Sequence, residues 1–99
     1  MHGFGVSYDE KGKKDYEGDY AYDRRSGYGT SYYQDGSVKY QGEWFENKHH
    51  GKGTLYYPNG KIQYEGEWQD GKYHGQGTLY SKLGFKLYSG QWINGEKAK

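Results

Sequence analysis

A glycine-rich unit of 24 residues repeats four times along this 99-residue chain, and no other feature limits the possible folds as strongly. Glycine pairs of the form GxG stand at the same place in each copy: Gly3 and Gly5, Gly27 and Gly29, Gly51 and Gly53, Gly75 and Gly77. A period kept without insertion or deletion is typical of arrays in which each unit packs against its neighbours. We therefore expect one repeat domain over 2–97, with units 2–25, 26–49, 50–73 and 74–97 and a tail at 98–99.

Other positions keep the same register. A third glycine, a tyrosine and a large aromatic residue recur together at Tyr16, Gly18 and Tyr20, at Tyr40, Gly42 and Trp44, at Tyr64, Gly66 and Trp68, and at Tyr88, Gly90 and Trp92. Tyrosine contributes 14 residues and glycine 18, whereas only 31% of the residues are hydrophobic. This composition is unusual for a globular domain and too aromatic for a disordered chain. It indicates rings packed against backbone that carries no side chain.

The unit at 50–73 shows the local structure most clearly. The dipeptide Asn59-Gly60 after Pro58 predicts a two-residue hairpin turn with positive φ at both central residues. Folding the chain back about that turn pairs Tyr57 with Ile62, Leu55 with Tyr64, Gly53 with Gly66, and Gly51 with Trp68. Because side chains alternate along a strand, these residues share one aromatic and glycine-rich face, and the opposite face is polar with a tyrosine stripe.

These observations predict an all-β fold: an elongated, twisted, single-layer antiparallel meander of four repeated β-hairpins, with about eight strands in an open array. The short polar linkers at 45–50 and 69–74 should join successive hairpins. One hairpin buries too little apolar surface to fold alone, so contacts between units must stabilise it. The glycines expected to form the floor beneath the rings are Gly27, Gly29, Gly42, Gly51, Gly53, Gly66, Gly75, Gly77 and Gly90.

The motif YxGxW, followed by a glycine turn and HGxG, resembles the MORN repeat. It reads YQGEW at 40–44 and YEGEW at 64–68, with HGKG at 50–53 and HGQG at 74–77. The resemblance covers essentially 2–97, although each unit is about one residue longer than the usual repeat. The first unit departs from the motif, with YEGDY at 16–20, and we expect both end units to act as caps.

The resemblance implies an assembly module, since MORN arrays are described as binding protein segments, self-associating and in some cases contacting phospholipid. We expect a non-enzymatic interaction or scaffolding module that presents its aromatic face to a protein or peptide, because exposed aromatic surface often marks binding sites. The residues expected to contact the partner are Tyr40, Trp44, Leu55, Tyr57, Tyr64, Trp68, Tyr88 and Trp92. The other interpretation of these rings is that they form the thin core of the fold.

Three alternatives remain open at the level of sequence: a homodimer formed through edge strands, a phospholipid-tethering module, and a targeting appendage of a larger enzyme. The chain carries 14 basic and 13 acidic residues, for a net charge of +1. This balance provides no general attraction to nucleic acid or to anionic lipid. We therefore expect no nucleic-acid partner, and we place phospholipid behind protein.

Catalytic, metal and cofactor sites are not expected. The chain has no cysteine, and among the equivalent histidines His2, His50 and His74 those in adjacent units would lie nearly 10 Å apart, two strands from one another, which is too far for one ion. The carboxylates are spread along a regular face, and no GxG opens a helix. No apolar run approaches the ~18 residues of a membrane span. We expect a soluble cytoplasmic protein, either free or associated with membranes or the cytoskeleton.

Overall fold

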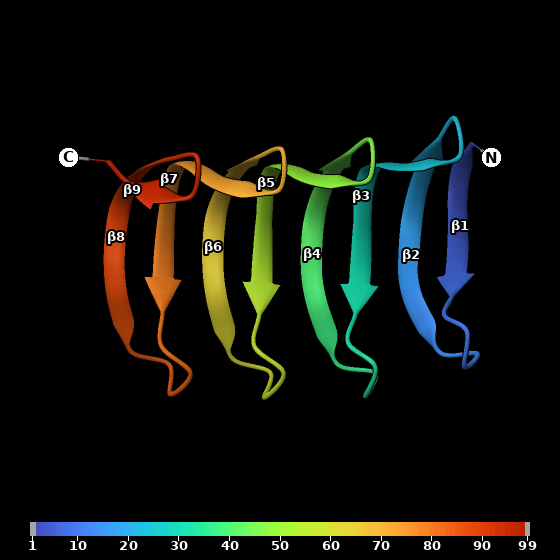
Figure 1. Cartoon of the computed structure of the whole chain (residues 1–99), viewed down its shortest axis with the longest axis horizontal. Coiled ribbons are helices and arrows are strands. Elements are labelled where there is room, and N and C mark those ends of the chain that lie inside the picture. Colours follow the sequence, from blue (N-terminus) through green and yellow to red (C-terminus); the bar gives the residue numbers. More distant parts are fainter. Residues whose placement is uncertain (1, 99) are drawn as a thin grey trace.

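Nine β-strands lie side by side in chain order and form one antiparallel sheet in the computed structural model, which describes residues 2–98 (Figure 1). The strands are β1 (Gly3–Tyr8), β2 (Lys14–Ala21), β3 (Arg24–Tyr32), β4 (Val38–Phe45), β5 (Lys48–Tyr56), β6 (Ile62–Gln69), β7 (Lys72–Tyr80), β8 (Lys86–Ile93) and β9 (Glu96–Lys97). The molecule measures 41 × 27 × 16 Å. Of the expected tail at 98–99, residue 99 lies outside the described residues.

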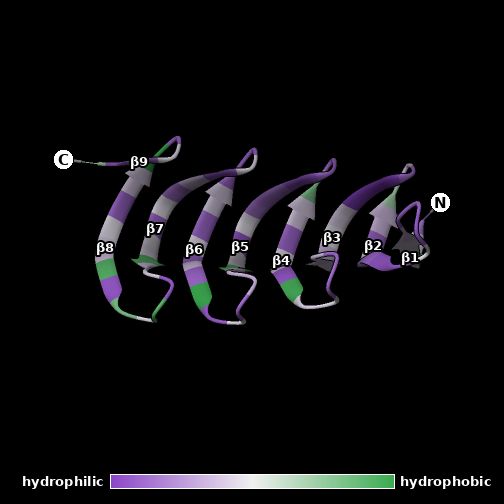
Figure 2. Ribbon diagram, turned by 60° about the horizontal axis from the view of Figure 1, so that its bottom comes forward, coloured by the Kyte–Doolittle hydropathy of each residue, from purple (hydrophilic) through white to green (hydrophobic). Residues whose placement is uncertain are grey.

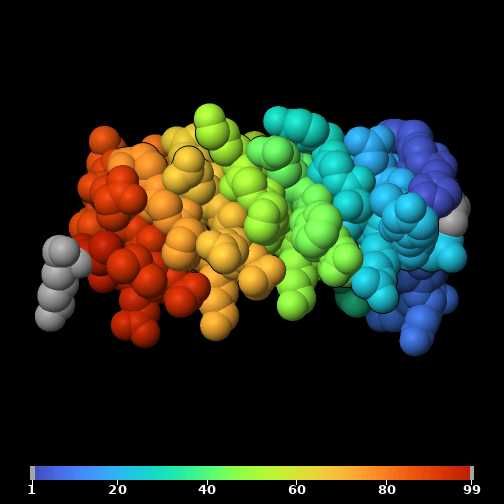
Figure 3. All heavy atoms as spheres, turned by 90° about the horizontal axis from the view of Figure 1, so that it is seen from above, coloured from blue at the N-terminus to red at the C-terminus, as the bar shows by residue number. Residues whose placement is uncertain are grey.

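The predicted all-β meander of repeated hairpins is confirmed. Each strand pairs with the strands before and after it, and the sheet stays open. The colours in Figure 3 form successive bands along the long axis, so the units follow one another in chain order. The short strand β9, which pairs with the end of β8, adds one strand to the expected eight. No helix in residues 2–98 is long and apolar enough to cross a membrane.

The two-residue hairpin turns lie in the segments that were expected to be plain linkers. Glu46 and Asn47, between β4 and β5, have φ values of 47° and 70°, and Asp70 and Gly71, between β6 and β7, have values of 50° and 81°. Positive φ at both central residues is the pattern of the type I′ turn, whose twist matches that of the adjoining strands. The linkers are therefore the tightest hairpins in the array.

The turn at Asn59-Gly60 differs from its prediction. Gly60 has a φ of 89°, whereas Asn59 is not among the residues with positive φ. The Gly60 N–H donates to the Tyr57 carbonyl at 2.9 Å, and the Tyr57 N–H donates to the Lys61 carbonyl at 2.8 Å. Pro58 and Asn59 are thus the central residues of an ordinary type I turn, and Gly60 forms the glycine bulge that follows it.

The strand register is confirmed except next to this turn. Gly51 pairs with Trp68, Gly53 with Gly66, and Leu55 with Tyr64, as predicted. The predicted pair of Tyr57 with Ile62 is wrong: the register shifts between Leu55 and Tyr56, and Ile62 pairs with Tyr56. The extra turn residue causes this shift, because a three-residue loop displaces the first pair by one position.

The core lies on one face of the sheet, which we call the inner face, and consists almost entirely of rings. Its buried members are Tyr16, Tyr40, Trp44, Tyr64, Trp68 and Trp92, against which Tyr20, Leu55, Tyr73, Leu79 and Tyr88 pack. Figure 2 shows strongly hydrophobic positions only as short segments of the ribbon, which agrees with a core made of aromatic residues rather than aliphatic ones. We call the opposite, uncovered face the outer face.

Candidate interaction site

A row of glycines crosses the whole sheet, with one residue on each of the strands β1 to β8. In order of pairing the glycine row is Gly5, Gly18, Gly29, Gly42, Gly53, Gly66, Gly77 and Gly90. A glycine inside a strand normally weakens a sheet, and it often marks a place where another group approaches closely. Here the two faces of the row are used differently.

On the inner face the glycine row is covered by tyrosine rings. A Cβ atom on Gly53 would overlap the Tyr40 hydroxyl, so the ring of the preceding unit lies directly on that glycine. The Tyr40 hydroxyl donates to the Glu43 carbonyl at 2.9 Å, and the side chain has no exposed surface. Tyr64 repeats the arrangement over Gly77. Burial raises the pKa of Tyr64 to about 12, because the phenolate would have to lose its hydration.

Tryptophans join these tyrosines into a continuous ladder. The Trp68 ring meets Tyr40 of the preceding unit edge to face at 5.3 Å and Tyr64 of its own unit at 5.0 Å. Its indole N–H donates to the Gly53 carbonyl at 3.1 Å. Trp44 and Trp92 make the equivalent bonds one unit before and one unit after. Edge-to-face pairs contribute about 0.5–1.5 kcal/mol each beyond the area that they bury.

In each unit, a position whose residue type varies covers the side of the tyrosine ring that faces away from the glycine. It is Arg25, His49, Tyr73 and Lys97 in successive units, and each side chain lies over the ring of Tyr16, Tyr40, Tyr64 and Tyr88 respectively. The His49 ring stacks on its tyrosine at 3.7 Å and 6°. Burial, together with the charges of Lys39 and Arg25, lowers the pKa of His49 to about 4. The sequence prediction missed this column, although alignment of the units places its cationic and flat side chains in register.

The eight residues expected to contact a partner lie mostly within the core. Tyr40 and Tyr64 have no exposed surface, and the three tryptophans are 4–5% exposed. Leu55, Tyr57 and Tyr88 are partly exposed. Contact between these residues and a partner stays a prediction, and only the last three present appreciable side-chain surface for it.

The first glycine of the GxG pair makes room for a carboxylate instead of a ring in the last three units. A Cβ atom on Gly51 would lie 2.8 Å from the Glu43 carboxyl, and one on Gly75 would overlap Glu67. Glu43 accepts the Lys52 N–H at 2.7 Å, and Glu67 accepts the Gln76 N–H at the same distance. Gly27 receives Asp19 in the same way. The sequence prediction had rings lying over Gly51; the structure places a carboxylate there.

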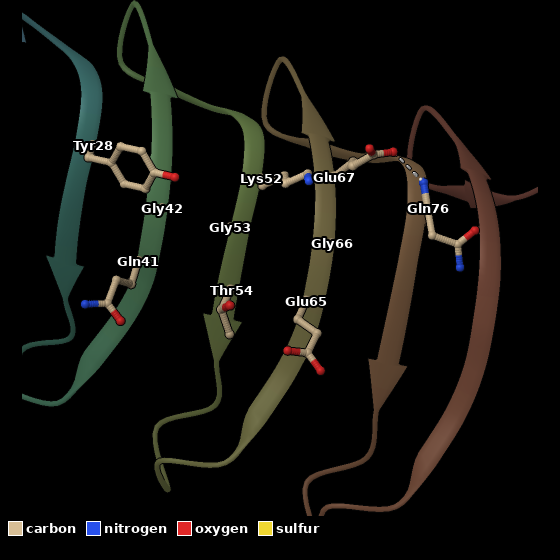
Figure 4. Close-up of a pocket in the computed structure, with 10 residues that line it drawn as sticks. All are labelled: Tyr28, Gln41, Gly42, Lys52, Gly53, Thr54, Glu65, Gly66, Glu67 and Gln76. Atoms are coloured by element: carbon tan, nitrogen blue, oxygen red, sulfur yellow. Dashed lines mark hydrogen bonds between the residues drawn. The ribbon is translucent and has the colours of Figure 1, made fainter.

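On the outer face the glycine row is the floor of a groove. Figure 4 shows Tyr28, Lys52, Glu67 and Gln76 along one side of Gly42, Gly53 and Gly66, and Gln41, Thr54 and Glu65 along the other. This part of the groove has a volume of about 520 Å³. A second hollow of about 430 Å³, lined by Phe4, Tyr28, Tyr32 and others, shares Tyr28 and Gln41 with the first. The two hollows form one groove, which we call the outer groove.

The outer face also carries the predicted tyrosine stripe, formed by Tyr8, Tyr32, Tyr56 and Tyr80. Tyr8 is 63% exposed and the other three are partly exposed. The Tyr32 hydroxyl donates to Glu17 at 2.7 Å, and the Tyr80 hydroxyl donates to Glu65 at 2.8 Å. These bonds hold two of the rings beside carboxylates at the edge of the outer groove.

The outer groove is acidic. Glu17, Glu65 and Glu67 line it, and Glu43 lines a neighbouring hollow together with Glu67. Lys14 forms an ion pair with Glu17 at 2.7 Å, and this hydrogen bond, followed by that from Tyr32, lowers the pKa of Glu17. Glu43, Glu65 and Glu67 form no ion pair with any residue in 2–98. Lys52 is the cation that lines the same hollow.

Residues 2–98 contain no group of three or more histidine, cysteine, aspartate or glutamate side chains placed to hold a metal ion. Of the equivalent histidines, His2 packs edge to face on Tyr22 at 4.7 Å, and His74 accepts the Asn94 N–H at 3.3 Å. The structure thus uses these two rings in contacts beside the turns.

The family model of the MORN repeat matches this chain at residues 16–38, 40–62, 64–82 and 88–98, which together make up about three quarters of it. The four matches begin at the equivalent tyrosines Tyr16, Tyr40, Tyr64 and Tyr88, the rings that lie on the glycine row. No curated protein matches the chain.

Proposed function

The chain belongs to the MORN repeat family, whose repeats are generally modules for interaction with proteins or membranes, and from that premise we propose that it is a non-enzymatic module that binds an extended segment of a partner protein in the outer groove. The observation that carries this proposal is the different use of the two faces of the glycine row. Rings fill the inner face, whereas the outer face has open backbone flanked by exposed aromatic and ionised side chains.

The inner face supports the proposal less well, although its rings were expected to contact the partner. Ligand sites combine apolar surface with a few polar groups that remain accessible. The inner tyrosines satisfy their hydroxyls internally, and Tyr64 lies between Gly77 and the Tyr73 ring. The outer groove instead offers Phe4 and Tyr28, which are 68% and 66% exposed, together with carboxylates that have no ion-pair partner in residues 2–98.

Selection of peptides from a random library on the intact chain tests the proposal. Thr54→Trp places a large side chain in the outer groove without touching the ring core, because Thr54 lies on the outer face. We expect the selected peptides to bind the wild type and to bind this variant at least tenfold more weakly, with an unchanged thermal midpoint. Leu55→Ala is the matched control, since Leu55 is the next residue and packs on the inner face. Peptides lost from the Leu55 variant and retained by the Thr54 variant would move the binding site to the inner face.

A further inference from the structure

We infer that the outer groove selects segments in the polyproline II conformation that carry a basic residue at every third position. This inference rests on the proposed function and names the chemistry of the partner. Three features of the outer face lead to it: the spacing of equivalent side chains, the exposed tyrosine stripe and the sign of the charge.

The spacing comes from the sheet itself. Equivalent residues of successive units lie two strands apart, and neighbouring strands are about 4.8 Å apart, so each feature of the outer groove recurs about every 9.6 Å. A polyproline II helix has three residues per turn and rises 3.1 Å per residue, so every third side chain returns to the same side after about 9.3 Å. The mismatch is only about 0.3 Å per unit. A polyproline II segment can therefore stay in register along the 41 Å length of the molecule.

Other regular conformations fit this spacing less well. In a β-strand the side chains on one side recur about every 6.8 Å, and the third residue along points to the opposite side. In an α-helix the closest return to one side is at seven residues, or about 10.5 Å, which accumulates a mismatch of about 1 Å per unit. The period of the groove thus favours polyproline II over both.

The tyrosine stripe provides the second feature. Tyr8, Tyr32, Tyr56 and Tyr80 recur once per unit on the outer face, and all four retain exposed surface. Grooves lined with aromatic residues are a common way of binding proline-rich segments, whose rings pack on the flat aromatic faces. Because a polyproline II segment is ordered before it binds, it loses little conformational entropy on binding.

The third feature is the negative charge of the outer face, which favours a basic residue between the prolines of the bound segment. Glu43 and Glu67 are equivalent residues, so their carboxylates recur with the same period as the tyrosines. Each accepts a backbone N–H through one oxygen, Oε2 of Glu43 and Oε1 of Glu67. The other oxygen of each accepts no hydrogen bond from residues 2–98. An arginine at every third position would present a guanidinium to each of these carboxylates, and such charge-assisted bonds are the strong ones.

The test measures binding of fluorescent 12-residue peptides to the intact chain at a fixed salt concentration. Four copies of Pro-Pro-Arg would span about 37 Å in polyproline II, which is close to the length of the groove. We expect this peptide to bind at least tenfold more tightly than four copies of Gly-Ser-Arg, which has the same charge and no preferred helix. Three copies of Pro-Pro-Pro-Arg should also bind more weakly, because a period of four does not match the units. Four copies of Pro-Pro-Glu should not bind.

Variants connect this binding to the outer groove. Tyr56→Ala should weaken binding of the Pro-Pro-Arg peptide at least fivefold, and the double variant Glu43→Gln with Glu67→Gln should weaken it at least tenfold. Tyr22→Ala is the matched control, because Tyr22 is 81% exposed in a turn away from the groove, and it should bind as the wild type does. Equal affinity for the Pro-Pro-Arg and Gly-Ser-Arg peptides would overturn the inference. If peptides selected from the random library bound the wild type but not the Thr54→Trp variant, the proposed function would still stand. A failure of every peptide to bind would overturn both.

Discussion

Trp68 donates its indole N–H to the carbonyl of Gly53 on the adjacent strand, at 3.1 Å. The same glycine has no side chain on the inner face, and the Tyr40 ring occupies that space. One residue without a side chain therefore provides both a hydrogen-bond acceptor for the following tryptophan and a floor for the preceding tyrosine. This double role explains why a strand so rich in glycine can be stable in a sheet with a single layer.

Gly53→Ala should destabilise the protein by about 3 kcal/mol or more, because the added methyl group would overlap the Tyr40 hydroxyl inside a closed core. Gly90→Ala is the matched control. Its Cβ would lie 2.8 Å from the Tyr88 hydroxyl, but Tyr88 is partly exposed in the last unit and can move aside. Denaturant unfolding followed by tryptophan fluorescence measures both. Equal losses of stability would show that the ring of Tyr40 is not held against the glycine.

Repetition made most of the fold predictable from the sequence. Because the side-chain period in a strand is two and the glycines recur every 24 residues, a single correct pair such as Gly53 with Gly66 determines the register of every unit. The turns were harder. Glu46-Asn47 has no glycine to indicate its positive φ values. Asn59-Gly60 has the usual dipeptide, but Pro58 fits the first central position of a type I turn.

The rings form the thin core that was the other interpretation of the sequence, but the side chains that close this core could not be predicted from a flat pairing diagram. The register of β6 with β7 shifts between Gly66 and Trp68, and an irregularity of this kind bends the strand. That bend brings Tyr73 over Tyr64 as a parallel stack at 3.9 Å. In a straight ladder Tyr73 pairs only with the residue opposite, and Tyr64 remains open. The expected binding face is therefore closed by a residue that varies from unit to unit, so no single residue type marks the position, although its side chains are all cationic or flat.

Ser31→Ala should stabilise the protein by up to about 1 kcal/mol. Ser31 is 5% exposed and occupies the position of Leu55 and Leu79, and its hydroxyl has no hydrogen-bond partner among residues 2–98. Removing a buried hydroxyl that lacks a partner removes its desolvation cost. Ser89→Ala is the control, since its hydroxyl bonds Thr78 at 2.9 Å at the surface, and it should be neutral or slightly destabilising. A lower thermal midpoint for Ser31→Ala would show that its hydroxyl has a partner.

Glu67→Ala should destabilise the protein by about 1 kcal/mol, because the Gln76 N–H loses the carboxylate that it bonds at 2.7 Å. Glu67→Gln should recover part of this loss, since an amide oxygen can still accept the hydrogen bond. Hydrogen exchange of the Gln76 amide gives a local readout, and its protection should fall in the alanine variant and be partly restored in the glutamine variant. Unchanged protection in both variants would show that the Glu67 carboxylate does not protect the Gln76 amide.

His49 should make stability depend on pH between about 4 and 6.5. Its pKa in the folded chain is about 4, below the ordinary value of 6.5, because the ring is buried on Tyr40 and lies near Lys39 and Arg25. Between these two values the unfolded chain binds a proton that the folded chain does not, so stability is complete above pH 6.5 and falls as the pH falls toward 4.

This difference predicts a loss of at most about 2 kcal/mol between pH 7 and pH 5 from the single histidine. His49→Tyr should remove that loss while keeping the stack, since Tyr73 occupies the same position in the next unit. Urea unfolding at both pH values measures the two proteins. If the wild type and His49→Tyr lost equal stability on acidification, protonation would act elsewhere, and the stacked imidazole would not be the group that couples pH to the aromatic core.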